Sequence, residues 1–199
     1  MKNYIKKFIA LLFGVCLMSL CGSLLVIASI GSDAIMVFEQ GLTVFLNVNF
    51  TIAIVCMNLF FLILVFILNK KKIHIGTIIV SVLIGPLVDL FLSLNIATTP
   101  SSLFGQILMV IVAILIGSFG VAAYIHADLG LAPLEGLVIT VTERCKLSYS
   151  IVKIICDIIL FVLGALIGGT FGIGSIIAII IFGPFTDLFL RLYKKVLKW

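Results

Sequence analysis

The sequence predicts an all-α integral membrane protein with six transmembrane helices, on three observations. Of its 199 residues, 63% are hydrophobic and 11% are charged, with a mean hydropathy of +1.43. Soluble domains have about 45–50% apolar and about 25% charged residues. The apolar residues form long runs, the positive charges cluster between certain runs, and one long segment occurs twice. The expected environment is therefore a lipid bilayer.

Six apolar runs are long enough to span a bilayer, which takes about 20 residues in a helix. They cover residues 6–30, 48–68, 73–94, 103–127, 147–167 and 173–192. The first run follows KNYIKK and resembles a signal peptide, but it is too long and no A-x-A cleavage site follows it. We therefore expect it to remain as the first span.

Twelve of the 13 Lys and Arg residues lie at the chain ends or in the second and fourth connections between spans. The other connections, at residues 31–47, 95–102 and 168–172, contain none. Because cytoplasmic loops are enriched in Lys and Arg, this alternation predicts six crossings with both termini in the cytoplasm. The net charge of +5 thus indicates topology, and no nucleic-acid partner is expected.

An internal repeat relates the two halves of the chain. The segment IGTIIVSVLIGPLVDLFLSL (75–94) aligns without gaps to IGSIIAIIIFGPFTDLFLRL (173–192), with 11 of 20 positions identical. The shared polar, glycine and proline positions are Gly76/Gly174, Gly85/Gly183, Pro86/Pro184 and Asp89/Asp187. A weaker match of EQGL (39–42) with LEGL (134–137) extends the repeat upstream.

The repeat predicts one membrane domain built from two three-span units, residues 1–99 and 100–199. An odd number of spans in each unit makes the second unit enter the membrane from the opposite side, so the repeats are expected to be inverted. Transporters built from such repeats place their binding site near the bilayer midplane, between the two units.

Several motifs resemble the YczE/YyaS/YitT family of bacterial membrane proteins. They are GSDAIMVFEQGL (31–42), KKIHIGTII (71–79), GPLVDLF (85–91), GLAPLEGL (130–137) and GPFTDLF (183–189). The first motif lacks the proline that the family pattern places after its glycine, whereas Gly130 to Glu135 keeps it. The resemblance covers nearly the whole chain and implies a six-span protein of the bacterial plasma membrane, without implying a substrate.

Two short segments, SDAIMVFEQGLTVFL and APLEGLVITVTE, follow the first and fourth spans. Their length suits interfacial or re-entrant helices, and we expect interfacial placement because the first span already crosses the bilayer. Asp33 is either a helix cap or a candidate residue for substrate or ion binding, and Pro133 is expected to occupy a first helical turn. Glu39 and Glu135, each near a glycine, are either solvated interfacial charges or the lining of an entrance on opposite faces.

Charged residues inside predicted spans are candidates for ligand or ion binding, because burying them in lipid is costly. Lys153 and Asp157 lie four residues apart, so they form either a structural ion pair or a coupled substrate or proton site. Asp89 and Asp187 follow the two Gly-Pro pairs, where proline is expected to kink the helix. Asp187 has Arg191 one turn later and Asp89 has no such neighbour.

The remaining polar and small residues carry weaker hypotheses. Asp128, with His126, is a candidate for proton handling. Ala113-x-x-x-Gly117 and Gly164-x-x-x-Gly168 predict close helix packing, and four of the five cysteines lie in apolar runs, where packing is expected. The two histidines have no second ligand at useful spacing, so no metal site or cofactor is expected.

Three function classes follow from these features. The favoured one is a transporter of an unknown small solute or ion, with Asp157, Lys153 and Asp89 as its main candidate residues. The alternative is a non-transporting scaffold or a substrate-capturing subunit that depends on a separate ATPase, since the chain has no Walker motif. An enzyme is not expected, because no nucleophile or metal motif is present. A homodimer and a partner subunit are both compatible with the sequence.

Overall fold

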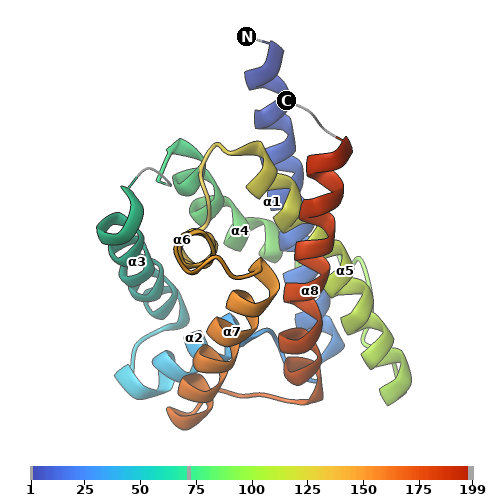
Figure 1. Cartoon of the computed structure of the whole chain (residues 1–199). Coiled ribbons are helices and arrows are strands. Elements are labelled where there is room, and N and C mark those ends of the chain that lie inside the picture. The colour runs from blue at the N-terminus through green and yellow to red at the C-terminus, as the bar shows by residue number, and fades with distance from the viewer. Residues whose placement is uncertain (1, 71–72, 197–199) are drawn as a thin grey trace.

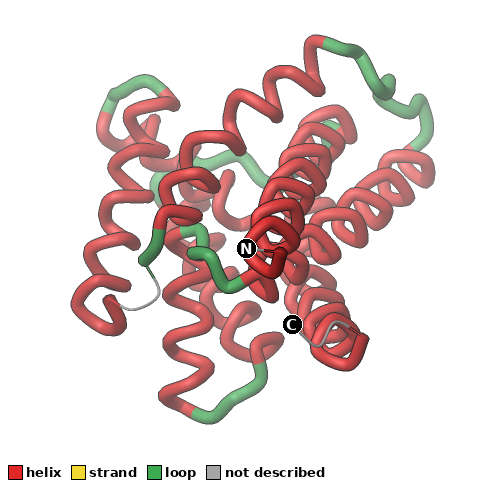
Figure 2. Tube along the Cα trace, turned by 90° about the horizontal axis from the view of Figure 1, so that it is seen from above, coloured by secondary structure: helices red, strands yellow, loops and turns green. Residues whose placement is uncertain are grey.

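The computed structural model describes residues 2–70 and 73–196, which form eight α-helices and no strand (Figure 2). Six of these helices are long and apolar enough to cross a membrane. They are α1 (Lys2–Ala28), α3 (Phe50–Asn69), α4 (Ile75–Ser93), α5 (Leu103–Ala127), α7 (Tyr149–Leu166) and α8 (Ile173–Val196). The predicted all-α class and the six long apolar helices are confirmed.

The other two helices, α2 (Ala34–Leu46) and α6 (Pro133–Cys145), have 13 residues each. Each is about 20 Å long at 1.5 Å per residue, which is too short to cross a hydrocarbon core of about 30 Å. Both start in the protein interior, where Ala34 and Leu134 are buried, and end in exposed residues. The expected interfacial placement is therefore wrong for their N-terminal halves, which are inserted among the long helices.

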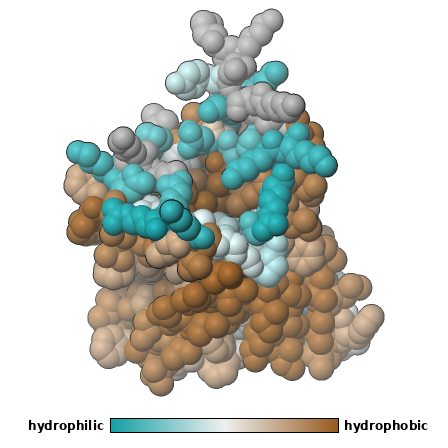
Figure 3. Space-filling model, viewed as in Figure 1, coloured by the Kyte–Doolittle hydropathy of each residue, from teal (hydrophilic) through white to brown (hydrophobic). Residues whose placement is uncertain are grey.

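Both chain ends lie at the same end of the molecule (Figure 1), and hydrophilic residues gather at this end on the face shown in Figure 3. We call this end the charged end. The remainder of that face is largely hydrophobic, as a lipid-facing surface requires. Lys71, Lys72 and Lys198 belong to the predicted charge clusters but lie outside the described residues.

The helix contacts recur in the two halves of the chain. Helix α1 packs against α4, as α5 packs against α8, and α2 packs against α7, as α6 packs against α3. The centre of the bundle is the crossing of α1 and α5. A Cβ added at Gly14 would lie 2.5 Å from the Gly120 carbonyl oxygen, and a Cβ added at Gly120 would lie 2.7 Å from the Gly14 carbonyl oxygen. Only glycine permits this separation of the two backbones.

Side-chain hydrogen bonds repeat in the same way. The Ser19 hydroxyl donates to the carbonyl oxygen of Ile84 over 3.3 Å, which joins α1 to α4. The Ser118 hydroxyl donates to that of Phe182, also over 3.3 Å, which joins α5 to α8. Equivalent residues in the two halves therefore make equivalent bonds inside the bundle.

Two backbone hydrogen bonds join the halves to each other. The Gly76 N–H at the start of α4 donates to the Leu129 carbonyl oxygen after α5, over 2.9 Å. The Gly174 N–H at the start of α8 donates to that of Ile30 after α1, over 2.8 Å. Each half thus holds the loop that leads into the short helix of the other half: Gly76 holds the loop before α6, and Gly174 holds the loop before α2.

The contact of α2 with α7 is closer than that of α6 with α3. A Cβ added at Gly164 would lie 2.7 Å from the backbone of Phe38, so α7 touches the α2 backbone directly. At Gly136 of α6, an added Cβ would lie 3.4 Å from a terminal methyl carbon of Val65, which is ordinary contact. The predicted packing role of Gly164 is confirmed.

We therefore expect Gly164→Ala to destabilise the protein by about 1–3 kcal/mol, as overpacking does in well-packed cores. Gly136→Ala is the matched control, because the same added methyl group meets only a movable side chain and helix propensity favours alanine. Thermal unfolding of both variants in detergent micelles measures the difference. Equal stability of the two variants would contradict the tight α2–α7 contact.

Candidate functional site

A buried ion pair lies in the N-terminal half of α7. The Lys153 ammonium nitrogen is 2.6 Å from a carboxylate oxygen of Asp157, and each side chain is 5% exposed. These are the fifth and ninth residues of an 18-residue helix, so the pair lies in the N-terminal half of α7, beyond its first turn. The Phe182 ring of α8 covers the ammonium group, with its centroid 5.6 Å from the nitrogen, close enough for a cation–π attraction. The predicted pair is confirmed.

The N-terminus of α2 brings Asp33 to this pair. Asp33 caps the helix, because one of its carboxylate oxygens accepts a hydrogen bond from the Met36 N–H over 2.9 Å. Such a cap satisfies a backbone donor that has no partner within the helix. Burial raises the pKa of Asp33, although the Met36 N–H and the Lys153 charge oppose this rise.

The N-terminus of α6 brings a second carboxyl group to the same place. Pro133 is the first residue of α6, as predicted, where its missing N–H has no consequence. Glu135 lies two residues later, in the first turn, and is 2% exposed. A carboxylate is favoured there by the positive end of the helix dipole. Burial nevertheless raises the pKa of Glu135, against the lowering effect of Lys153.

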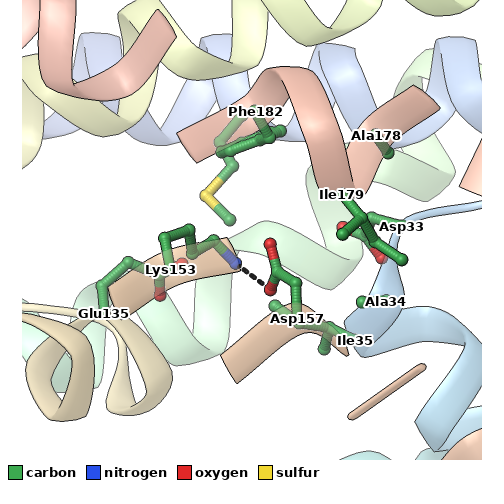
Figure 4. A pocket seen from close by; sticks show the side chains of 10 residues that line it. Asp33, Ala34, Ile35, Glu135, Lys153, Asp157, Ala178, Ile179 and Phe182 are labelled. Carbon is green, nitrogen blue, oxygen red and sulfur yellow. Dashed lines mark hydrogen bonds and ion pairs between the residues drawn. The ribbon is translucent and has the colours of Figure 1, made fainter. Parts of the chain in front are cut away.

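These four ionisable residues line one enclosed cavity (Figure 4), with α1 and α8 closing its other sides. Its volume of about 10 Å³ admits roughly one water molecule. The lining residues are Met18, Asp33, Ala34, Ile35, Glu135, Lys153, Asp157, Ala178, Ile179 and Phe182. Residues of both halves of the chain therefore form the site.

The charges around the cavity do not balance. Asp33, Glu135 and Asp157 carry three negative charges when ionised, and Lys153 carries one positive charge. The N-terminal ends of α2 and α6 supply about half a positive charge each. About one negative charge remains, which is costly in a dry interior unless a cation or a proton neutralises it.

Two tyrosine hydroxyl groups lie close enough to feel this charge. The hydroxyls of Tyr124 (α5) and Tyr149 (α7) are buried and have no hydrogen-bond partner among the described residues. Glu135 exerts the largest Coulombic effect of any charged group on both. Tyr149 also precedes Lys153 by four residues, so the two lie on one face of α7. Buried polar groups without a partner commonly hydrogen-bond to water.

Asp89 and Asp187 do not reach the cavity. Asp89 is exposed on α4, away from Lys153 and Asp157, so the structure does not bring these three candidates together. Asp187 forms the predicted ion pair with Arg191, over 2.7 Å, and the arginine side chain is 72% exposed. Both prolines of the repeat lie inside helices that continue past them.

Glu39 and Asp128 also lie outside the cavity lining. Glu39 is the sixth residue of α2, where burial and the charge of Asp33 raise its pKa to about 8. Asp128 is exposed and ends α5 in a left-handed conformation. Because Glu135 is the third residue of α6, it does not correspond to Glu39 in the structure, and the predicted EQGL–LEGL equivalence is wrong. Equal helix lengths instead align α2 and α6 from their first residues.

An open cavity of about 520 Å³ lies at the opposite end of the molecule from the chain termini, between the loops that follow α1 and α7 (Figure 1). We call it the vestibule. Its polar lining consists of Ser29, Ser32, Gln40 and Thr170, and no charged side chain lines it. The Thr170 hydroxyl donates to the Gln40 side-chain oxygen and connects the α7–α8 loop to α2. Ser32 lines the vestibule and the next residue, Asp33, lines the enclosed cavity.

Sequence reasoning missed Phe182 and the two tyrosines as parts of the site. Phe182 stands directly before the repeated Gly183-Pro184 pair, but one of many phenylalanines carries no distinguishing signal. Tyr149 had a signal in its four-residue spacing from Lys153. Tyr124 had none, because its position depends on how α5 packs against the other helices.

We expect Lys153→Met to destabilise the protein by about 3–5 kcal/mol, the usual effect of leaving a buried charge unpaired. Asp157→Asn should cost less, because Asp33 and Glu135 still act electrostatically on Lys153. Arg191→Met is the matched control: it breaks an exposed pair of the same spacing and should cost under about 1 kcal/mol. Unfolding in mixed detergent and SDS micelles measures all three, and a larger effect of Asp157→Asn would refute the charge balance.

The comparisons with known proteins place the chain in a family but assign no activity to it. The model of a family of unknown function, DUF6198, matches residues 5–191. An uncharacterized protein of Haemophilus influenzae (strain Rd) is 28% identical over 197 residues, which covers 96% of this chain and 86% of that protein. No solved structure matches the chain. The chain therefore belongs to the DUF6198 family, whose function is unknown.

Proposed function

We propose that the protein is a secondary transporter of a small solute, coupled to an ion, whose site is the enclosed cavity. One observation carries the proposal: two short helices, one from each half, point their N-termini at a buried Lys153–Asp157 pair. Short helices that end in the membrane interior form ligand and coupling-ion sites in transporters built from inverted repeats. A charged group buried this deeply in a membrane protein favours a functional role over a packing role.

The repeated contacts support the inverted arrangement. The equivalent bonds of Ser19 and Ser118 relate the two units, and Gly76 and Gly174 make equivalent bonds across them. With three long helices in each unit, an in-plane pseudo-two-fold axis relates units 1–99 and 100–199. We propose that the charged end faces the cytoplasm of a bacterial cell and that the vestibule opens outward. The likeness to the YczE/YyaS/YitT family stays a prediction.

The small size of the enclosed cavity indicates a closed state. A volume of about 10 Å³ excludes any solute larger than roughly one water molecule. Small-molecule sites usually measure about 300–1,000 Å³, a range that the vestibule reaches with about 520 Å³. Transport then requires the N-terminus of α2, which separates the two spaces, to move between an open and a closed position.

Uptake into proteoliposomes tests the proposal. Liposomes containing the purified protein are given a mixture of small metabolites, and their contents are compared by mass spectrometry with those of protein-free liposomes. We expect the wild-type protein to accumulate at least one solute and Asp157→Asn to abolish this accumulation. Asp89→Asn is the matched control and should transport normally, because Asp89 is exposed and distant from the cavity.

Each outcome has a clear reading once size-exclusion chromatography shows that the variants are folded. Normal uptake by Asp157→Asn, or loss of uptake in Asp89→Asn, would show that the site assignment is wrong. Absence of any uptake by the wild-type protein, together with a partner that co-purifies in equal amount, would support a scaffold or a substrate-capturing subunit instead.

Cysteine labelling tests the proposed orientation. Cys145 is exposed at the end of α6 beside Arg144, and Thr170 is exposed in the α7–α8 loop. In a background without other cysteines, a membrane-impermeant maleimide should label Thr170→Cys in intact cells. Cys145 should react only after the cells are permeabilised. The reverse pattern would place the charged end outside and overturn the assigned topology.

A further inference from the structure

Glu135 is the one carboxyl group in the enclosed cavity that has neither an ion-pair partner nor a helix-capping bond among the described residues. Asp157 pairs with Lys153 over 2.6 Å, and Asp33 accepts the helix-capping bond from Met36. Glu135 is 2% exposed, lines the cavity, and has no ion-pair partner among residues 2–70 and 73–196. In Figure 4 its side chain reaches toward Lys153, which Asp157 already binds.

An ionised Glu135 therefore needs a positive charge from outside the protein. Lys153 neutralises one carboxylate and the two helix ends offset about one more, which leaves the third. An isolated carboxylate in a dry interior is so unfavourable that the group takes up a proton instead. Glu135 therefore needs a neutralising charge whenever the cavity is closed, and it no longer needs one when the cavity opens to water.

The geometry favours a proton over a metal ion as the source of that charge. No group of three or more His, Cys, Asp or Glu residues in the described part of the chain is close enough to hold a metal ion. The cavity volume of about 10 Å³ leaves roughly one water-sized space, and the lining is otherwise apolar. The three carboxyl groups are too far apart to coordinate one dehydrated cation together, whereas a proton needs only a single carboxylate.

We propose that Glu135 takes up and releases a proton as the cavity closes and opens, which makes the proton the coupling ion. This inference rests on the proposed transport function and identifies its ion. In the closed state the proton is bonded to a carboxyl oxygen of Glu135. On opening it leaves to water, and the carboxylate becomes a second partner for Lys153.

The groups around Glu135 are consistent with this role. The buried Tyr124 hydroxyl lies close enough to interact directly with the Glu135 carboxyl group, and the buried Tyr149 hydroxyl is close enough to feel its charge. Tyr149 is the first residue of α7, three positions after the exposed Lys146. The other titratable or charged residues near the cavity are Cys21 on α1, Asp33 before α2, and Lys153, Cys156 and Asp157 on α7. None of the α8 residues that line the cavity is titratable.

Proton linkage to unfolding tests the proposal without any solute. A proton that the folded state holds and the unfolded state releases makes the unfolding equilibrium constant rise about tenfold per pH unit. The sign follows from burial: stability is full at low pH and is lost as pH rises above the normal glutamate pKa of about 4.3. Burial and the charge of Asp33 raise the pKa of Glu39 to about 8, so the parent protein for these measurements is Glu39→Gln.

We expect the unfolding equilibrium constant of the parent protein in lipid nanodiscs to rise with pH between pH 5 and pH 8. Adding Glu135→Gln to the parent should lower the steepness of this rise by a factor of about ten per pH unit. Glutamine mimics the protonated side chain, so this variant should also be more stable than the parent at high pH. Asp33→Asn keeps the helix cap and should retain the part of the dependence that Glu135 contributes, and the exposed control Asp89→Asn should retain all of it.

The alternatives give different results. An unchanged pH dependence in Glu135→Gln, or its loss in Asp33→Asn alone, would overturn the assignment to Glu135. Stabilisation of the parent by sodium chloride relative to choline chloride, lost in Glu135→Gln, would show that the site binds a monovalent metal cation instead of a proton. Proton linkage in a protein that moves no solute would retain Glu135 as a proton site while refuting the transport function.

Discussion

Burial of three carboxyl groups with a single lysine is the constraint on which the rest of this structure depends. The Lys153–Asp157 pair lies in the N-terminal half of α7, in a chain that exposes many large apolar side chains on its outer surface. In such surroundings a charge persists only when a counter-charge, a hydrogen bond or a proton stabilises it. The short helices α2 and α6 meet this need in part, because their N-terminal ends lie beside the pair and carry partial positive charge.

The same constraint accounts for the broken arrangement of the helices. A backbone that ends inside a membrane must find hydrogen-bond partners within the protein, since lipid supplies none. Asp33 provides one such partner and Pro133 removes the need for another. The Gly76–Leu129 and Gly174–Ile30 bonds stabilise the loops before these helices. The fold can therefore place two helix ends at one buried site because each half stabilises the other's loop.

The two cavities suggest how closure and charge are connected. The N-terminus of α2 lies between them, with Ser32 in the vestibule and Asp33 in the enclosed site. The Gln40–Thr170 bond ties α2 to the loop before α8 at the outer rim. A displacement of α2 would open the enclosed site to water from the vestibule and change the hydration of all four ionisable residues together. Hydration, and hence protonation, would then follow the position of a single short helix.

Local patterns in the sequence predicted much of this protein. Hydropathy and length identified the six long helices, since a bilayer demands long apolar runs. A four-residue spacing on one helix identified the Lys153–Asp157 and Asp187–Arg191 pairs, because such residues meet whatever the tertiary fold. Helix-start chemistry likewise identified Asp33 as a cap and Pro133 as a first-turn residue.

Long-range packing decided that one site contains Asp33, Glu135 and the Lys153–Asp157 pair. No local sequence pattern encodes this packing. These residues are separated by up to 124 positions in the chain and meet because α2, α6 and α7 converge. Asp89 and Asp157 looked alike in the sequence as acids within apolar runs, yet one is exposed and the other buried. Hydropathy indicates that a helix lies in the membrane. The neighbouring helices decide which face of that helix turns inward, and only carboxylates on the inward face can become part of a site.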